Sequence, residues 1–184
     1  MRTKRIRNGI AVVLASALVS LAGAAVAQAQ PTRGGNPTPS VVTDEAYVLK
    51  NLKSGKVLTA TSSANGATVV QQPKADLPSN DLQYWFEVLD DPYWSFQNFQ
   101  AGRNLGINGA STASGAVAII ANGSSDTNQD WTKDSSAYSG NYFALKNRKS
   151  GLCLGISGAS TANGAQAAQF PCDGSANQGW ELTH

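Results

Sequence analysis

The sequence NLGINGASTASGA (residues 104–116) returns almost unchanged as CLGISGASTANGA (residues 153–165). Near-identity between two stretches of one chain is typical of an internal repeat, and a repeat constrains the fold more strongly than local propensity does. The first letters of the two copies differ, because Cys153 stands where the earlier copy has Asn104. The duplication therefore predicts corresponding loops in two copied units, only one of which carries a cysteine.

Extending the comparison outward gives three repeats, at residues 47–89 (repeat one), 93–134 (repeat two) and 142–182 (repeat three). Each begins with an aromatic-led run that ends in Asn, and continues through a Gly turn, a second apolar run and an Asn-Gly or Ser-Gly turn. Each repeat closes on a Gln-x-Trp triplet. These triplets are Gln83-Tyr84-Trp85, Gln129-Asp130-Trp131 and Gln178-Gly179-Trp180. The loop of repeat one is two residues shorter than its counterparts.

Each repeat predicts four short strands, because brief apolar runs alternate with the Gly, Asn and Ser turns that favour hairpins. Helical periodicity is absent after the N-terminal segment, and Gly, Ser, Asn and Thr are too frequent for long helices. Twelve short strands in threefold repetition indicate an all-β fold. We expect a closed or nearly closed barrel, because closure removes exposed strand edges.

The Gln-x-Trp triplets predict a structural core near the axis of this barrel. A Trp side chain carries a large apolar surface and one N–H group, which needs an acceptor when the ring is buried. One Trp from each repeat would meet its symmetry mates there, and the neighbouring Gln can both donate and accept where the strand begins. The predicted structural residues are Trp85, Trp131, Trp180, Gln83 and Gln129.

Residues 1–29 predict a secretory signal peptide. A basic head precedes an apolar run from Ile10 to Val26, and small residues surround a cleavage point at Ala29. The apolar run is a little short for a membrane span, so we expect no membrane association after cleavage. Residues 30–46 are rich in Pro, Gly, Ser and Thr and predict a flexible linker, which leaves 47–184 as one domain. The expected location is extracellular.

The charge of the chain argues against nucleic acid as a partner. The whole sequence has a formal net charge of +2, but four of its 14 Lys and Arg residues lie before residue 8. The chain without its signal peptide keeps ten basic residues against 12 acidic ones, and no basic cluster remains to neutralise a phosphate backbone.

Cysteine and histidine usage bears on disulfide and metal chemistry. Cys153 and Cys172 are the only cysteines, and an oxidising compartment favours a disulfide between them. Closing that loop would stabilise the fold by about 3 kcal/mol. The only histidine is His184, and no Cys-x-x-Cys spacing occurs, so we expect no metal site. No Gly-rich phosphate loop enters a helix, so we expect no cofactor.

Three Gln-x-Trp triplets in register, together with the Asn-Gly and Ser-Gly turns, resemble the ricin B-type lectin family. The resemblance covers Tyr47 to Leu182 and implies a β-trefoil fold, in which each repeat can carry one shallow sugar pocket. In this family a cysteine in the second strand commonly pairs with one after the third strand of the same repeat. Cys153 and Cys172 occupy those places, whereas Val57 and Asn104 replace the first cysteine in repeats one and two.

The sugar-binding positions that the resemblance implies are where this sequence departs from the family. The family's carboxylate, an Asp two residues after the second-strand cysteine, is replaced by Gly155, Gly106 and Thr59. The third-strand amide is replaced by Ala168, Ile119 and Val70, and the aromatic platform corresponds to Phe170, Ala121 and Gln72. The Asn before the motif Gln survives as Asn177 and Asn128, whereas repeat one has Leu82. Gly155 and Gly106 either let the backbone approach something closely or permit a bulge.

Repeat three keeps the largest share of the family's pattern, so it is the predicted carbohydrate site. An amide accepts from and donates to sugar hydroxyls, and an aromatic ring contacts the C–H face of a sugar. The candidate residues are Phe170, Asn177 and Gln178, with Gln169 and Asp173 as replacement polar groups. A structural role for these residues, with Phe170 packed under a loop and Asn177 capping a turn, is the alternative. A different sugar, or a polymer that lies across several shallow sites, is also left open.

The expected function is therefore a secreted, non-catalytic module that binds a glycan or polysaccharide. The alternative is a trefoil scaffold that has lost sugar binding and binds or inhibits a protein. An enzyme is disfavoured because no Ser-His-Asp or Cys-His set can form around His184, and the adjacent Asp90 and Asp91 would face opposite sides of a strand. The sequence leaves the oligomeric state and the identity of the sugar open.

Overall fold

A computed structural model describes residues 41–42, 45–76 and 81–184. The predicted signal peptide, 1–29, lies outside the described residues, as does most of the predicted linker, 30–46. The described part of the chain is all-β, with short strands and 3₁₀ turns of three residues each. None of its helical turns is long and apolar enough to cross a membrane.

Each repeat forms the four predicted strands. Repeat one contains β2 (Val48–Asn51), β3 (Val57–Ala60), β4 (Val69–Gln72) and β5 (Trp85–Asp90). Repeat two contains β6 (Tyr93–Asn98), β7 (Asn104–Ile107), β8 (Ala118–Ala121) and β9 (Trp131–Asp134). Repeat three contains β10 (Phe143–Asn147), β11 (Cys153–Ile156), β12 (Ala167–Phe170) and β13 (Gly179–Thr183). The 3₁₀ turns are η1 (Asp81–Gln83), η2 (Asn108–Ala110), η3 (Thr127–Gln129), η4 (Ser157–Ala159) and η5 (Ala176–Gln178).

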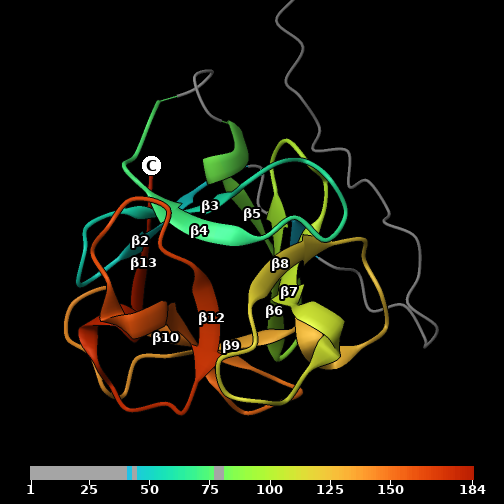
Figure 1. Cartoon of the computed structure of the whole chain (residues 1–184). Helices are drawn as coiled ribbons and strands as arrows, with labels where there is room; N and C mark the ends of the chain where they lie inside the picture. The colour runs from blue at the N-terminus through green and yellow to red at the C-terminus, as the bar shows by residue number, and fades with distance from the viewer. Residues whose placement is uncertain (1–40, 43–44, 77–80) are drawn as a thin grey trace, which may run out of the picture.

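The first and fourth strands of the repeats form a ring of antiparallel neighbours. Strand β5 pairs with β6, β6 with β9, β9 with β10, β10 with β13, and β13 with β2. A bridge between Tyr47 and Trp85 completes the ring, with backbone N···O distances of 2.9 and 2.8 Å. The hairpins β3–β4, β7–β8 and β11–β12 touch one another through the bridges Thr68–Ile119, Val70–Gln166 and Val117–Ala168. Figure 1 shows the three repeats as consecutive colours around one body. The structure confirms the predicted threefold barrel.

A thirteenth strand lies in the predicted linker. Strand β1 (Val41–Val42) pairs antiparallel with β5, where Val41 opposes Leu89 and Val42 opposes Val88. Strand β5 can take this partner because, with six residues, it is longer than the fourth strands β9 and β13 and offers backbone groups beyond the ring. Composition alone gave no signal for this pairing, since Val41 and Val42 form only a two-residue apolar run.

The three motif tryptophans form the centre of the core, and each indole N–H has the acceptor that burial requires. Trp85, Trp131 and Trp180 are fully buried in one apolar cluster. Their Nε1 atoms donate to carbonyls of the second strand of the same repeat, at 3.1, 3.1 and 2.9 Å. These carbonyls belong to Leu58, Leu105 and Leu154. Each indole therefore ties the fourth strand of its repeat to the second.

The motif glutamines both donate and accept, and all three donate to the loop after the third strand. Their Nε2 atoms donate to the carbonyls of Pro73, Asn122 and Pro171, at 2.8, 2.9 and 2.9 Å. The Oε1 atoms of Gln83 and Gln178 accept from backbone N–H groups of Ala75 and Asp173 in the same loops. A buried Gln therefore fixes the return of the chain toward each core Trp.

The repeats are joined by an asparagine at the end of each first strand. The Nδ2 atom of Asn51 donates to the carbonyl of Asn177 at 3.0 Å, and that of Asn98 donates to Leu82 at 3.0 Å. The third member, Asn147, donates to the carbonyl of Asn128 at 2.9 Å. Each asparagine thus binds the preceding repeat beside its Gln-x-Trp triplet, and Asn51 closes the circle by joining repeat one to repeat three.

The duplicated loops are held by a buried Gln from a neighbouring repeat. The Nε2 atom of Gln169 donates at 2.9 Å to the carbonyls of Ser111 and Ala113, and Gln71 makes the same contacts at 2.9 Å with Ser160 and Ala162. The corresponding position of repeat two is Ile120, whose carbonyl accepts from Gly66 in the shorter loop of repeat one. We call this pair of hydrogen bonds from Gln71 or Gln169 the clamp. The two longer loops have nearly the same sequence because each binds to a clamp of the same geometry.

The predicted disulfide is confirmed. The other two repeats have different contacts at the equivalent position. Cys153 and Cys172 are bonded, with their Cα atoms 5.0 Å apart. In repeat two, the Nδ2 atom of Asn104 donates to Oε1 of Gln129 at 3.2 Å. In repeat one, Val57 packs with Val48 and Tyr84 in a small apolar cluster. A covalent bond, a hydrogen bond and an apolar contact thus occupy equivalent places.

The neighbouring residues Gln71 and Gln72 provide a matched test of the clamp. Gln71→Ala removes two donated hydrogen bonds and the acceptor of the Ser54 hydroxyl, at 2.7 Å, so we expect it to lower the free energy of unfolding by about 2 kcal/mol. The Gln72 amide has no hydrogen bond to a described residue, so Gln72→Ala should change stability by less than about 0.5 kcal/mol. Urea denaturation followed by Trp fluorescence measures both, and equal effects would contradict the clamp.

Candidate functional site

The structure brings the predicted repeat-three residues together, but most of their polar groups are already engaged. Gln178 is buried and bonded to the loop that it anchors. Asn177 is buried as well, and its Nδ2 atom donates to the carbonyl of Ile156 at 3.3 Å. Phe170 ends β12 and is half-buried, and Asp173 is exposed. Ligand binding by this set stays a prediction.

Gln169 is placed where a ligand does not reach it. Its side chain is completely buried, its two donated bonds hold the loop of repeat two, and its Oε1 atom accepts from the Ser150 hydroxyl at 2.7 Å. A sugar could contact this amide only after the inter-repeat clamp opened. Adjacent strand residues face opposite sides, so Gln169 points inward where its neighbour Ala168 holds the pocket position. We therefore leave Gln169 out of the proposed site.

In repeats two and three, the motif Gln and the Asn before it lie close to the position of the family's missing Asp. A Cβ atom added to Gly155 would lie 3.3 Å from Nδ2 of Asn177 and 2.9 Å from Cγ of Gln178. The same distances separate Gly106 from Asn128 and Gln129. These glycines therefore permit a close approach by the motif Gln and by the Asn before it.

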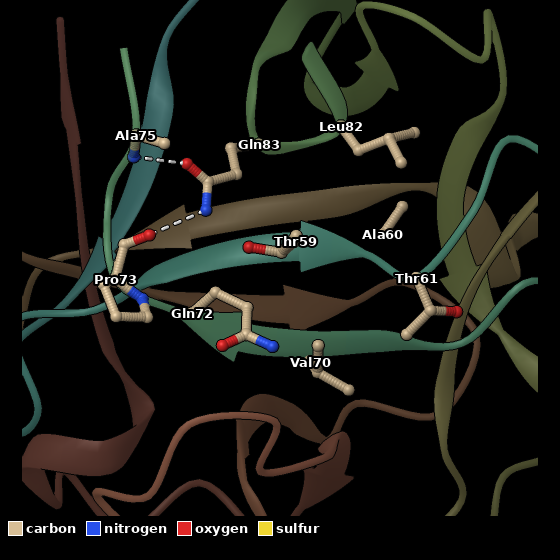
Figure 2. A pocket seen from close by; sticks show the side chains of 9 residues that line it. All are labelled: Thr59, Ala60, Thr61, Val70, Gln72, Pro73, Ala75, Leu82 and Gln83. Atoms are coloured by element: carbon tan, nitrogen blue, oxygen red, sulfur yellow. Dashed lines mark hydrogen bonds between the residues drawn. The ribbon is translucent and has the colours of Figure 1, made fainter. Parts of the chain in front are cut away.

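Repeat one differs, because a cavity opens at the same place. It has a volume of about 450 Å³. The lining residues are Thr59, Ala60, Thr61, Val70, Gln72, Pro73, Ala75, Leu82 and Gln83. Figure 2 shows them on the two strands of the β3–β4 hairpin and on the segment that carries Gln83, with Leu82 directed toward the Ala60–Thr61 end. Three of these positions, Thr59, Val70 and Gln72, correspond to the family's carboxylate, amide and aromatic positions.

The cavity offers neutral polar groups beside apolar ones. Gln83 is occupied by its bonds to Pro73 and Ala75, which Figure 2 draws as dashed lines. The Gln72 amide is half-buried and makes no hydrogen bond with a described residue. Thr59 and Thr61 each donate to a backbone carbonyl, which leaves lone pairs on their hydroxyl oxygens. None of the nine lining residues is charged. The cavity can therefore exchange hydrogen bonds with hydroxyl groups and cover an apolar patch.

A second cavity, of about 320 Å³, lies beside the disulfide of repeat three. Asp134, Tyr138 and Asp173 contribute its ionisable groups. Burial raises the pKa of Tyr138, and the negative charges of Asp173 and Asp134 raise it further. Asp173 is held below its ordinary pKa, chiefly by the Ser175 hydroxyl, which donates to it at 2.6 Å, and then by the Ser175 backbone N–H. Asp134 and Asp173 each accept a hydrogen bond from the backbone N–H two residues later, so both carboxylates stabilise local turns.

Repeat one departs from the family's pattern at Thr59, Val70 and Gln72, and the sequence therefore favours repeat three. The structure places these three residues on the wall of the cavity. Two sequence differences accompany the cavity. Repeat one has Leu82 where the other repeats have Asn, and Thr59 where they have Gly. For metal binding, no group of three or more His, Cys, Asp or Glu residues in the described part of the chain could hold an ion.

Comparison with known families agrees with the fold. A family model described as ricin-type beta-trefoil lectin domain-like matches residues 38–121 and 127–184. The chain therefore belongs to the ricin B-type lectin family. Among curated proteins, no sequence matches.

Solved structures show the same architecture. A designed threefold-symmetric protein, ThreeFoil, is 33% identical with a TM-score of 0.70, over 76% of this chain and 98% of that chain. An exo-β-1,3-galactanase from Clostridium thermocellum is 28% identical with a TM-score of 0.70, over 77% of this chain but only 30% of the enzyme. A ricin B-like lectin of Macrolepiota procera, solved with lactose, has a TM-score of 0.65 at 20% identity, over 85% of this chain and 99% of that chain.

The Asp173 turn makes a pH-dependent contribution that can be measured. Because the folded-state pKa of Asp173 is lowered, its contribution to stability is present above the unfolded value of about 3.9 and is lost as the pH falls through the folded value. Ser175→Ala removes the largest cause of the shift. We expect the pKa of Asp173 to rise toward about 3.9 in an NMR titration of the carboxyl carbon. An unchanged pKa in this variant would contradict the assigned cause.

Proposed function

We propose that this protein is a secreted, non-catalytic module that binds a neutral carbohydrate in the cavity of repeat one. The observation that carries the proposal is the hollow between β3 and η1, in which the Gln72 amide is available for a ligand. Family membership supports the class of ligand. The lectin of Macrolepiota procera was solved with lactose, and an earthworm R-type lectin was solved with GalNAc.

The composition of the cavity fits a neutral sugar. A single sugar buries little area, so its orientation must come from hydrogen bonds. The Gln72 amide can donate to one hydroxyl and accept from another, and Thr61 can accept at the rim. Val70, Leu82 and Pro73 supply the apolar surface that an aromatic ring supplies elsewhere in the family. A charged sugar would lose hydration without gaining a counter-charge, because no lining residue is ionisable.

Repeat one supports ligand binding better than repeat three for a physical reason. In repeat three, the side-chain amides of Asn177 and Gln178 donate to backbone carbonyls, and a ligand would have to break these hydrogen bonds. Breaking a buried hydrogen bond leaves a polar group unsatisfied, which costs about 1–3 kcal/mol. Gln72 carries no such cost. The predicted repeat-three set is therefore the second choice for the sugar site.

Two further parts of the proposal rest on the sequence and on the comparisons. Secretion is supported by the signal pattern at residues 1–29 and agrees with a disulfide between Cys153 and Cys172. A non-catalytic role is supported by the absence of a carboxylate among the nine residues that line the cavity. The similarity to the galactanase covers 30% of that enzyme, so this chain corresponds to a part of it.

Glycan binding by residues 30–184 tests the proposal. We expect retention of neutral glycans on an array, and Gln72→Ala should weaken binding about tenfold, since lost hydrogen bonds worth about 1.4 kcal/mol change affinity by that factor. Phe170→Ala is the matched control, because it truncates the corresponding position of repeat three and should leave the affinity within about twofold.

The outcomes separate the candidate sites. Loss of binding in the Phe170 variant with full binding in the Gln72 variant would place the site in repeat three. Failure of the protein to retain any glycan would remove the carbohydrate function. Equal affinity for anionic glycans would contradict the neutral cavity.

A further inference from the structure

We propose that the binding surface of repeat one continues across the repeat boundary onto Gln166 of repeat three, and that the ligand is an oligosaccharide whose second sugar unit contacts this glutamine. The inference rests on the proposed carbohydrate function, and it adds the class of sugar and a residue that selects it. All nine residues that line the cavity belong to repeat one. Gln166 therefore lies beyond the place of the first sugar unit.

A segment of repeat three runs antiparallel to β4, the strand that forms one wall of the cavity. The backbone N–H of Gln71 donates to the carbonyl of Ala165 at 2.9 Å, and the carbonyl of Gln71 accepts from the N–H of Gly164 at 2.8 Å. An antiparallel bridge joins Val70 to Gln166 beside these hydrogen bonds. The wall of the cavity therefore has repeat three as its direct neighbour.

Gln166 lies on the cavity side of this boundary. Residues directly opposed across an antiparallel pair share one face of the sheet, so Gln166 shares the face of Val70, a cavity residue. Gly164 lies beside the other cavity residue of β4, because a Cβ atom added to it would lie 4.0 Å from Nε2 of Gln72. Apart from its neighbours in the chain, no other described atom lies within 4 Å of that position, so the space beside the Gln72 amide is open.

Gln166 offers a ligand one fixed acceptor. Its Nε2 atom donates to the carbonyls of Val69 and Ala167, at 2.6 and 2.8 Å, which uses both amide hydrogens. Its Oε1 atom accepts no hydrogen bond from a described residue, and this oxygen is not among the buried unsatisfied atoms, so it reaches solvent. Because the donor end is anchored, little side-chain entropy is lost when the oxygen accepts from a sugar hydroxyl.

The other two repeat boundaries carry no amide at this position. Val117 opposes Ala168 beside the third strand of repeat three, and Thr68 opposes Ile119 beside that of repeat two. Among the three boundaries, the amide therefore occurs beside the repeat that has the cavity. A cavity and an adjacent acceptor coincide on one repeat, as expected if one ligand contacts both.

The size of the cavity agrees with a ligand larger than one sugar. Its volume of about 450 Å³ falls within the range of about 300–1,000 Å³ for pockets that hold drug-sized ligands. A chain of sugars that leaves the cavity over β4 passes from Gln72 to Gln166. A single sugar seated in the cavity contacts Gln72 and not Gln166, which gives the two residues separable effects on affinity.

The test compares each monosaccharide with a disaccharide that contains it, using residues 30–184. The probe pairs are galactose with lactose, glucose with cellobiose, and xylose with xylobiose, and NMR titration of the side-chain amide signals follows even weak binding. For the pair that binds, we expect the Gln72 signal to move with both sugars and the Gln166 signal to move with the disaccharide alone. The disaccharide should bind about fivefold more tightly, since its second unit gains a hydrogen bond.

Gln166→Val removes the acceptor and copies Val117, the residue that this fold carries at the equivalent position of repeat two. We expect the variant to lose about fivefold in affinity for the disaccharide and to keep its affinity for the monosaccharide within about twofold. A residue with a structural role alone would change both affinities equally. Val117→Ala is the matched control at another boundary, and both affinities should stay within about twofold.

The outcomes separate this inference from the carbohydrate function. Equal affinity for both members of the pair that binds, or an equal loss for both in the Gln166 variant, would overturn the inference and leave the carbohydrate function intact. Retention of no glycan by the unmodified protein would remove the function and the inference together. If the Gln166 variant does not fold, the response of the Gln166 amide signal in the unmodified protein decides the question.

Discussion

The hydrogen bond from each buried indole N–H to a second-strand carbonyl is the constraint on which the rest of this structure depends. A Trp side chain provides the largest apolar surface available to a small core, but its N–H group cannot be buried without an acceptor. Trp85, Trp131 and Trp180 meet this requirement in the same way, through Leu58, Leu105 and Leu154. The distance from the second strand to the fourth is thereby fixed in every repeat, and the segment between them is left to vary.

The variation between equivalent positions shows how a duplicated unit becomes three different ones without losing its frame. A disulfide, an Asn–Gln hydrogen bond and a Val–Tyr contact serve the same junction. A clamp Gln occupies the same place in repeats one and three, while repeat two has Ile120 and receives a shorter loop. Contacts across the boundaries between repeats, from Asn51, Asn98 and Asn147, are kept in all three, because the ring closes only if every boundary is made.

The candidate site lies where the symmetry is broken. Two repeats have Gly and Asn beside the outer face of the second strand, and the third has Thr59 and Leu82 and leaves a cavity. A filled pocket gains packing and satisfied hydrogen bonds, whereas an open one exposes the Gln72 amide to solvent. The open pocket therefore departs from the arrangement that this chain uses twice, which is the pattern expected where a ligand supplies the missing contacts.

The sequence by itself determined the threefold repeat, the all-β class, the burial of the three tryptophans and the disulfide, because each follows from spacing and from the chemistry of single residue types. It could not determine which pocket is open, since that depends on whether the side chain at 82, 128 or 177 reaches across to another strand. It also missed the pairing of Val41 and Val42 with β5, and it placed Gln169 in the sugar site when that side chain faces the interior. These outcomes belong to the tertiary structure because they are set by distances between residues far apart in the chain, which local pattern does not encode.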